Sequence, residues 1–174
     1  RMYLSMAFGS PGADLEIQLV QELVSASAEM GAERIVLSDT IGVATPNQVI
    51  DVLSACKPYI GRADFGLHMH DTYGRALANC EAGLNFGVQY FDASVGGAGG
   101  CPFAPDATGN ICSEDLVYMM NEMNIKTGID INHLIKIAKE AERILDYKLP
   151  GQVMHAGERL KKYSLEDVKT AKGN

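Results

Sequence analysis

The amino-acid sequence predicts an α/β fold of the (β/α)8 TIM-barrel type, of which this chain carries four strand–helix units. Short apolar segments with strand character alternate with amphipathic helical segments. The strand centres recur about every 30 residues, the size of a β–α–β unit, near Leu4, Val36, Gly66 and Phe91. Such a series makes a parallel sheet with helices outside it. A complete barrel takes about 250 residues, so four units are half of one. Periodicity alone favours the alternative, an open doubly wound sheet, but the positions of the polar residues reverse that preference.

The elements are read from runs of apolar residues and the turn residues between them. Strands are expected at residues 1–8, 34–38, 64–70 and 88–95. Apolar residues at helical spacing follow each strand. Helices are expected over 14–30, from 45, from about 77 to 87, from 113 and from 130. The inward-facing side chains of the last helix are expected to be Leu134, Ile137, Ala141 and Ile144.

Capping residues support these helix boundaries, because short polar side chains can accept hydrogen bonds from the free N–H groups of a first helical turn. The expected N-caps are Asp14, Thr45, Ser113 and Asp130. Pro46 follows Thr45 at the first helical position, where proline is favoured. Gly31 and Gly87 are expected to end two of the helices.

Composition argues against several classes of partner. The net charge is −7 and no stripe of Lys and Arg precedes the tail, which argues against nucleic acid. No apolar run approaches the length of about 20 residues that a membrane span needs, and no signal peptide is recognisable. The four cysteines form no CxxC pair. We therefore expect reduced thiols and a cytoplasmic location.

Polar side chains gather at or just after the C-terminal ends of three expected strands. They are Asp39 and Thr40, His68 and His70, and Asp92 and Ser94. Reactive groups at the C-terminal ends of several parallel strands are typical of barrel enzymes, whereas open sheets place their sites mostly around one switch point. This distribution favours the barrel.

The sequence His68-Met69-His70 is the sharpest local signal. Residues i and i+2 of a strand share a face, so both imidazoles should point inward while Met69 packs against the helices. Two buried imidazoles are difficult to protonate together, whereas a divalent cation can take a neutral nitrogen from each. The alternative is two independently hydrogen-bonded core histidines.

Carboxylates near the histidines are open to two interpretations. Asp39 is either part of the site or a turn residue before Gly42. Asp71 is better explained as a cap of the helix that follows it.

A glycine-rich segment runs from Gly96 to Asn110. It lacks the ending of a nucleotide-binding Walker loop. Cys101 lies among its glycines and could exchange a proton if a metal lowers its pKa, whereas Cys56 and Cys80 have the spacing of core residues. The amide of Asn110 could reach back to the cation.

These motifs resemble those of 3-hydroxy-3-methylglutaryl-CoA (HMG-CoA) lyases. The segments 38–42, 68–74, 94–103 and 107–110 occur in the order of that family. The resemblance covers residues 1–150 and the C-terminal half of the family's barrel, leaving residues 151–174 as a tail. The Gly-Gly-Cys-Pro sequence separates these lyases from the synthases and carboxylases that share the His-x-His motif.

The resemblance implies a role for each matching residue. His68, His70 and Asn110 would be ligands of Mg²⁺ or Mn²⁺, and His68 would also belong to the catalytic set. Cys101 would take part in proton transfer. Asp39 and Glu114 would be acid/base or supporting carboxylates. The substrate would be an acyl-CoA, HMG-CoA, cleaved to acetyl-CoA and acetoacetate.

Two departures from the family pattern keep alternatives open. Gly96, Ala98 and Phe103 stand where Ala, Leu and Tyr are expected, which leaves room for a related acyl-CoA lyase or a Claisen-condensing synthase. The family's Arg-Asp strand and its early Glu have no match here. We therefore expect a homo-oligomer or a missing N-terminal half-barrel as partner, with a non-catalytic half-barrel as the third possibility.

Overall fold

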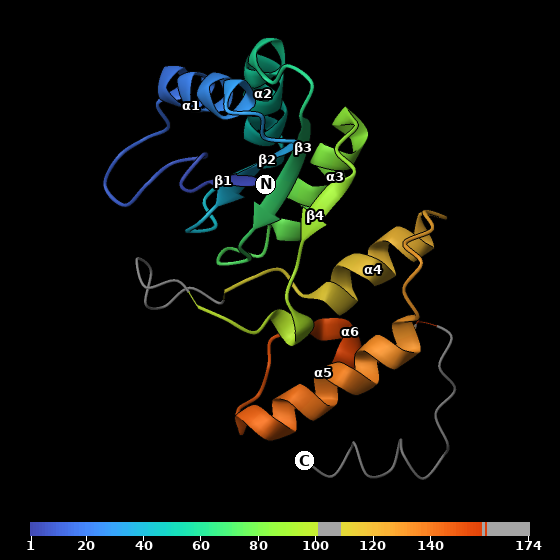
Figure 1. The fold of residues 1–174 in the computed structure, drawn as a ribbon. Coiled ribbons are helices and arrows are strands. Elements are labelled where there is room, and N and C mark those ends of the chain that lie inside the picture. Colours follow the sequence, from blue (N-terminus) through green and yellow to red (C-terminus); the bar gives the residue numbers. More distant parts are fainter. Residues whose placement is uncertain (101–108, 158, 160–174) are drawn as a thin grey trace, which may run out of the picture.

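The computed structural model describes residues 1–100, 109–157 and 159. Figure 1 shows two groups of elements: a sheet covered by helices α1, α2 and α3, and a second group formed by α4, α5 and α6. No helix in the described part combines the length and the apolar character needed to cross a membrane.

Four parallel strands form one sheet. They are β1 (Met2–Leu4), β2 (Arg34–Asp39), β3 (Asp64–Met69) and β4 (Tyr90–Asp92). Their order in the sheet is β1-β2-β3-β4, the same as their order in the chain, and every pair is parallel. A doubly wound sheet reverses its strand order at a switch point. The sequential order is instead that of consecutive units of a barrel, and it confirms the predicted alternation of parallel strands and helices.

Helices follow the strands as expected. The α-helices are α1 (Ile17–Glu29), α2 (Pro46–Cys56), α3 (Ala76–Phe86), α4 (Ser113–Glu122), α5 (Ile131–Leu145) and α6 (Gln152–Ala156). Two short 3-10 helices are η1 (Lys57–Tyr59) and η2 (Val95–Gly97). Helix α6 lies within the segment expected to be a tail.

The two faces of the sheet differ in character. One face packs against α1–α3 and forms the main core, to which the strands contribute Leu4, Ile35, Leu37, Leu67 and Met69. On the opposite face Tyr3, Val36, Gly66 and Tyr90 share one register position. Tyr3 is 46% exposed, while the Arg34 guanidinium lies 3.2 Å from the centre of the Tyr90 ring. This second face is the one that a barrel would enclose.

Several predicted helix ends are confirmed. Thr45 caps α2 in a reciprocal pair of contacts with Gln48, Asp130 caps α5, and Gly87 ends α3 in the left-handed conformation. The N-cap predictions for Asp14 and Ser113 are wrong. Helix α1 begins later, after Glu16, and the backbone pair Ser10–Ala13 closes a turn before it. Ser113 is the first residue of α4 rather than its cap.

The predicted inward face of α5 is partly wrong. Ile137 and Ile144 are 43% and 68% exposed. The buried residues are Ile135 and Ala138, which pack with Leu149 and Met154 in a second core cluster. Helix α5 buries a different face from the predicted one because it packs against η2, α4 and α6 rather than against a strand.

Candidate metal centre and glycine-rich segment

The two histidines of the His-x-His motif converge. His68 lies near the end of β3, and His70 directly follows the strand. Their Nε2 atoms are 3.2 Å apart, and their ring centres 5.2 Å. Met69 between them is buried in the main core, as the alternation along a strand requires.

The environment of His70 favours the neutral form of its imidazole. Burial lowers the pKa of its imidazole, and the neighbouring His68 lowers it further, whereas a contact with the Asn110 side chain opposes the shift. A neutral imidazole offers a nitrogen lone pair. Two adjacent ligands of an octahedral cation, bonded at about 2.1 Å, lie about 3 Å apart. The Nε2 separation of 3.2 Å fits such a pair of ligands.

Asp92 lies beside His68 on the adjacent strand. The two residues share a register position, and the Asp92 Oδ2 atom lies 3.6 Å from His68 Nδ1. A carboxylate behind a metal-binding imidazole fixes its orientation and raises its basicity. The sequence marked Asp92 only as a polar residue at a strand end.

Asn110 lies beside His70, as the predicted ligand set requires. The segment around Asn110 runs antiparallel to the end of β3: Ile111 N donates to Met69 O at 3.1 Å, and Asp71 N donates to Gly109 O at 2.9 Å. The structure therefore brings His68, His70 and Asn110 together. Within residues 1–100, 109–157 and 159, no group of three or more His, Cys, Asp and Glu side chains is arranged to hold a metal ion. A site here would rest on two imidazoles and an amide from this chain.

Asp39 lies on the other side of the sheet. It shares a register position with Met69, whereas His68 pairs with Ser38. Its carboxylate is buried and accepts hydrogen bonds from Val43 N at 2.9 Å and Ala44 N at 3.0 Å. Burial raises the pKa of Asp39, opposed by these backbone bonds and by the charge of Arg75. This is the geometry of the turn residue that the sequence offered as the alternative, and a role in catalysis stays a prediction.

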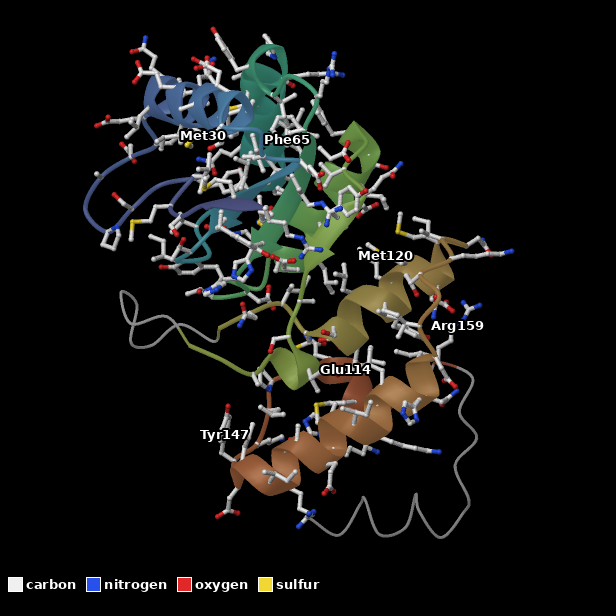
Figure 2. The ribbon with its side chains drawn as sticks, in the orientation of Figure 1. Met30, Phe65, Glu114, Met120, Tyr147 and Arg159 are labelled. Atoms are coloured by element: carbon white, nitrogen blue, oxygen red, sulfur yellow. The ribbon has the colours of Figure 1, made fainter. Side chains whose placement is uncertain are left out.

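Glu114 is bound to the glycine-rich segment. Its side chain is fully buried, and both oxygens accept from Gly96 N, at 3.1 and 2.9 Å. Burial raises the pKa of its carboxyl. Figure 2 shows Glu114 at the start of α4, where that helix meets the segment after β4. Glu114 thus holds the backbone at Gly96, and its role as an acid/base or supporting carboxylate stays a prediction.

Of the remaining predicted residues, Asp71, Cys56 and Cys80 lie within the described part of the chain. The prediction that Asp71 is the N-cap of α3 is wrong, because Arg75 occupies that position. Asp71 instead accepts a hydrogen bond from Ala76 N, the first residue of the helix, at 2.8 Å. Cys56 and Cys80 are buried and free, and burial raises their thiol pKa values to about 11 and about 12. Cys101 and Phe103 lie outside the described residues.

Comparisons with known proteins identify the family of this chain. A family model described as HMGL-like matches residues 5–140. The chain is 43% identical over 153 residues to the hydroxymethylglutaryl-CoA lyase YngG of Bacillus subtilis, covering 87% of this chain and 51% of that protein. It is 40% identical to the mitochondrial hydroxymethylglutaryl-CoA lyase of Homo sapiens, covering 90% of this chain and 48% of that one.

A solved structure of a relative has a similar fold over nearly the whole chain. An HMG-CoA lyase from Acinetobacter baumannii, in complex with coenzyme A and 3-methylmalate, is 37% identical with a TM-score of 0.84, covering 94% of this chain and 54% of that chain. The present chain thus spans about half the length of the relatives it matches. With the matching family model covering most of its length, the chain belongs to the HMGL-like family.

Proposed function

We propose that this chain is the metal-binding half of a carbon–carbon lyase that cleaves HMG-CoA to acetyl-CoA and acetoacetate. The observation that carries the proposal is the pair of Nε2 atoms 3.2 Å apart, with Asn110 beside them, in a member of the HMGL-like family. The lyase names of its relatives support the reaction, and the coenzyme A bound to the Acinetobacter relative supports an acyl-CoA substrate.

Different residues of the chain would bind the metal ion, orient its ligands and transfer protons. His68, His70 and Asn110 would hold Mg²⁺ or Mn²⁺, and Asp92 would orient His68. The bound cation would acidify the substrate's C3 hydroxyl by taking a share of its electron density. A base would remove that proton as the C2–C3 bond breaks, releasing acetoacetate and the enolate of acetyl-CoA. Cys101 is the proposed proton donor to the enolate carbon.

The described residues supply this site incompletely. The buried carboxylates Asp39 and Glu114 accept hydrogen bonds from backbone N–H groups. On the second face of the sheet, which a barrel would enclose, Tyr3 is 46% exposed. We therefore include in the proposal that the complete site needs a complementary half-barrel or a second copy. We also propose a cytoplasmic location, as the sequence predicts, whereas the human relative is mitochondrial.

Acetoacetate release in the presence of Mg²⁺ or Mn²⁺, measured beside sedimentation, tests the reaction. The isolated chain is expected to bind Mn²⁺ weakly, to associate, and to turn over HMG-CoA far more slowly than about 1 per second, the low end of ordinary enzymes. The chain completed by the first half of the barrel should release acetoacetate. A completed protein that binds Mn²⁺ but condenses acetyl-CoA with a 2-oxo acid instead would favour the synthase alternative.

A further inference from the structure

A short segment between α5 and α6 lies against the start of the glycine-rich segment. It comprises Leu149, Pro150 and Gly151, and we call it the loop seat. Gly151 N donates to Gly96 O at 3.3 Å. A Cβ atom on Gly96 would lie 2.4 Å from Leu149 Cδ1, so the leucine side chain rests directly on the Gly96 backbone.

Gly96 is thereby held from three directions. Glu114 accepts a hydrogen bond from Gly96 N, and Gly151 N donates one to Gly96 O. The side chain of Leu149 covers the Cα atom of Gly96. Gly96 and Gly97 both have positive φ angles, 62° and 73°. Glycine adopts such angles readily but has no side chain to hold it there. The surrounding contacts therefore fix the turn at η2.

The loop seat is itself fixed by carboxylates. Glu142 accepts from Leu149 N at 2.8 Å, and Asp115 accepts from Gln152 N at 3.0 Å and Val153 N at 2.7 Å. His155 Nε2 lies 3.1 Å from the Leu149 carbonyl oxygen. Leu149 is only 1% exposed. These contacts make the seat a rigid support rather than a loose connection.

The turn at η2 is joined to the candidate metal ligand. Ala98, directly after η2, donates its N–H to Val95 O at 3.0 Å and accepts the Asn110 side-chain amide at 3.1 Å. The Asn110 side chain also contacts His70, and because its nitrogen is bound to Ala98, its oxygen is the atom turned toward that histidine. A cation prefers this oxygen as ligand. The position of Ala98 thus decides how the Asn110 oxygen is presented.

We infer that the loop seat positions Asn110 for cation binding, with Leu149 as the positioning residue. The inference rests on the proposed function, because it assigns Leu149 a role at the proposed metal site. Leu149 touches no metal ligand itself: it holds Gly96, which sets Ala98, which orients the Asn110 amide.

A double-mutant cycle on Mn²⁺ affinity tests this inference. Free Mn²⁺ is followed by its electron paramagnetic resonance signal, using the full chain. Leu149→Ala is expected to weaken Mn²⁺ binding by about 3- to 10-fold, at or below the range typical of supporting residues around a metal. Leu149→Met, of similar volume, should bind nearly as the parent does. In an Asn110→Ala background, Leu149→Ala should have no further effect.

Controls separate the inference from its assumptions. Leu53→Ala removes an equally buried leucine from the other core cluster and should leave Mn²⁺ affinity unchanged. If His70→Ala does not weaken binding, the proposed metal site fails. If His70→Ala weakens it but Leu149→Ala does not, only the positioning role fails. An equal effect of Leu149→Ala with and without Asn110 would also overturn it. Should Leu149→Ala not fold, Leu149→Val gives the same comparison with a smaller change.

Discussion

Asp39 on β2 pairs with Met69 on β3, and this places its carboxylate on the helix-facing side of the sheet, opposite the imidazole of His68. Paired residues of parallel strands point to the same face, and Met69 is buried in the core that α1–α3 cover. The two Asp39 oxygens hold the turn that leads into α2. The first prediction therefore concerns stability.

Asp39→Asn should destabilise the fold at neutral pH by about 1–2 kcal/mol, because one of the two N–H groups loses its acceptor. Burial raises the folded-state pKa of Asp39, so the folded protein binds that proton more tightly than the unfolded chain does. The resulting stabilisation is complete below the ordinary pKa of 3.8 and is lost as the pH rises through the folded-state pKa. Asparagine does not titrate.

The difference in unfolding free energy between parent and Asp39→Asn should therefore shrink as the pH rises from about 3.5 to 7. Urea unfolding at several pH values measures it, with the exposed Asp14→Asn as control. A difference that grows with pH would contradict the assignment.

His70→Ala should weaken Mn²⁺ binding at least about tenfold, because one of two converging imidazoles is lost. His133→Ala, an exposed histidine on α5, is the matched control and should bind Mn²⁺ as the parent does. Isothermal titration at pH 7.5 gives both affinities. Equal binding by parent and His70→Ala would mean that the histidines are ordinary core residues.

The described cysteines should react slowly with a thiol reagent. The reactive form is the thiolate. With a pKa of about 11, Cys56 is deprotonated at pH 8 in only about one molecule in a thousand, and Cys80 in fewer. Burial also raises the pKa of Cys112. Labelling of the native protein with Ellman's reagent should therefore show at most one fast thiol, and Cys101→Ser should remove it. A fast thiol that remains in the Cys101→Ser protein would refute this assignment.

Gly96→Ala should destabilise the fold more than Gly74→Ala does. Both glycines have similar positive φ angles, 62° and 68°, and a side chain there costs roughly 1–2 kcal/mol. A Cβ on Gly74 meets open space, whereas one on Gly96 would overlap Leu149 and add about 1–3 kcal/mol. Urea unfolding of the two variants measures the difference. Equal losses would mean that Leu149 moves aside without cost.

Local patterns in the sequence determined much of this protein. The alternation of apolar runs predicted the four strand–helix units, and the caps at Thr45, Asp130 and Gly87 follow from the hydrogen bonds of single helix ends. The period of two along a strand predicted that His68 and His70 share a face. These features depend on neighbours only a few residues away, so the sequence carries them directly.

Tertiary structure decided the rest. Strand register placed the side chains of Asp39 and His68 on opposite faces of the sheet. Packing of α5 against η2 buried Ile135 rather than Ile137. The contacts of Gly96 with Glu114 and Leu149 join distant segments. No periodicity marks such contacts, because they arise only when separate elements pack and each buried polar group must find its partner.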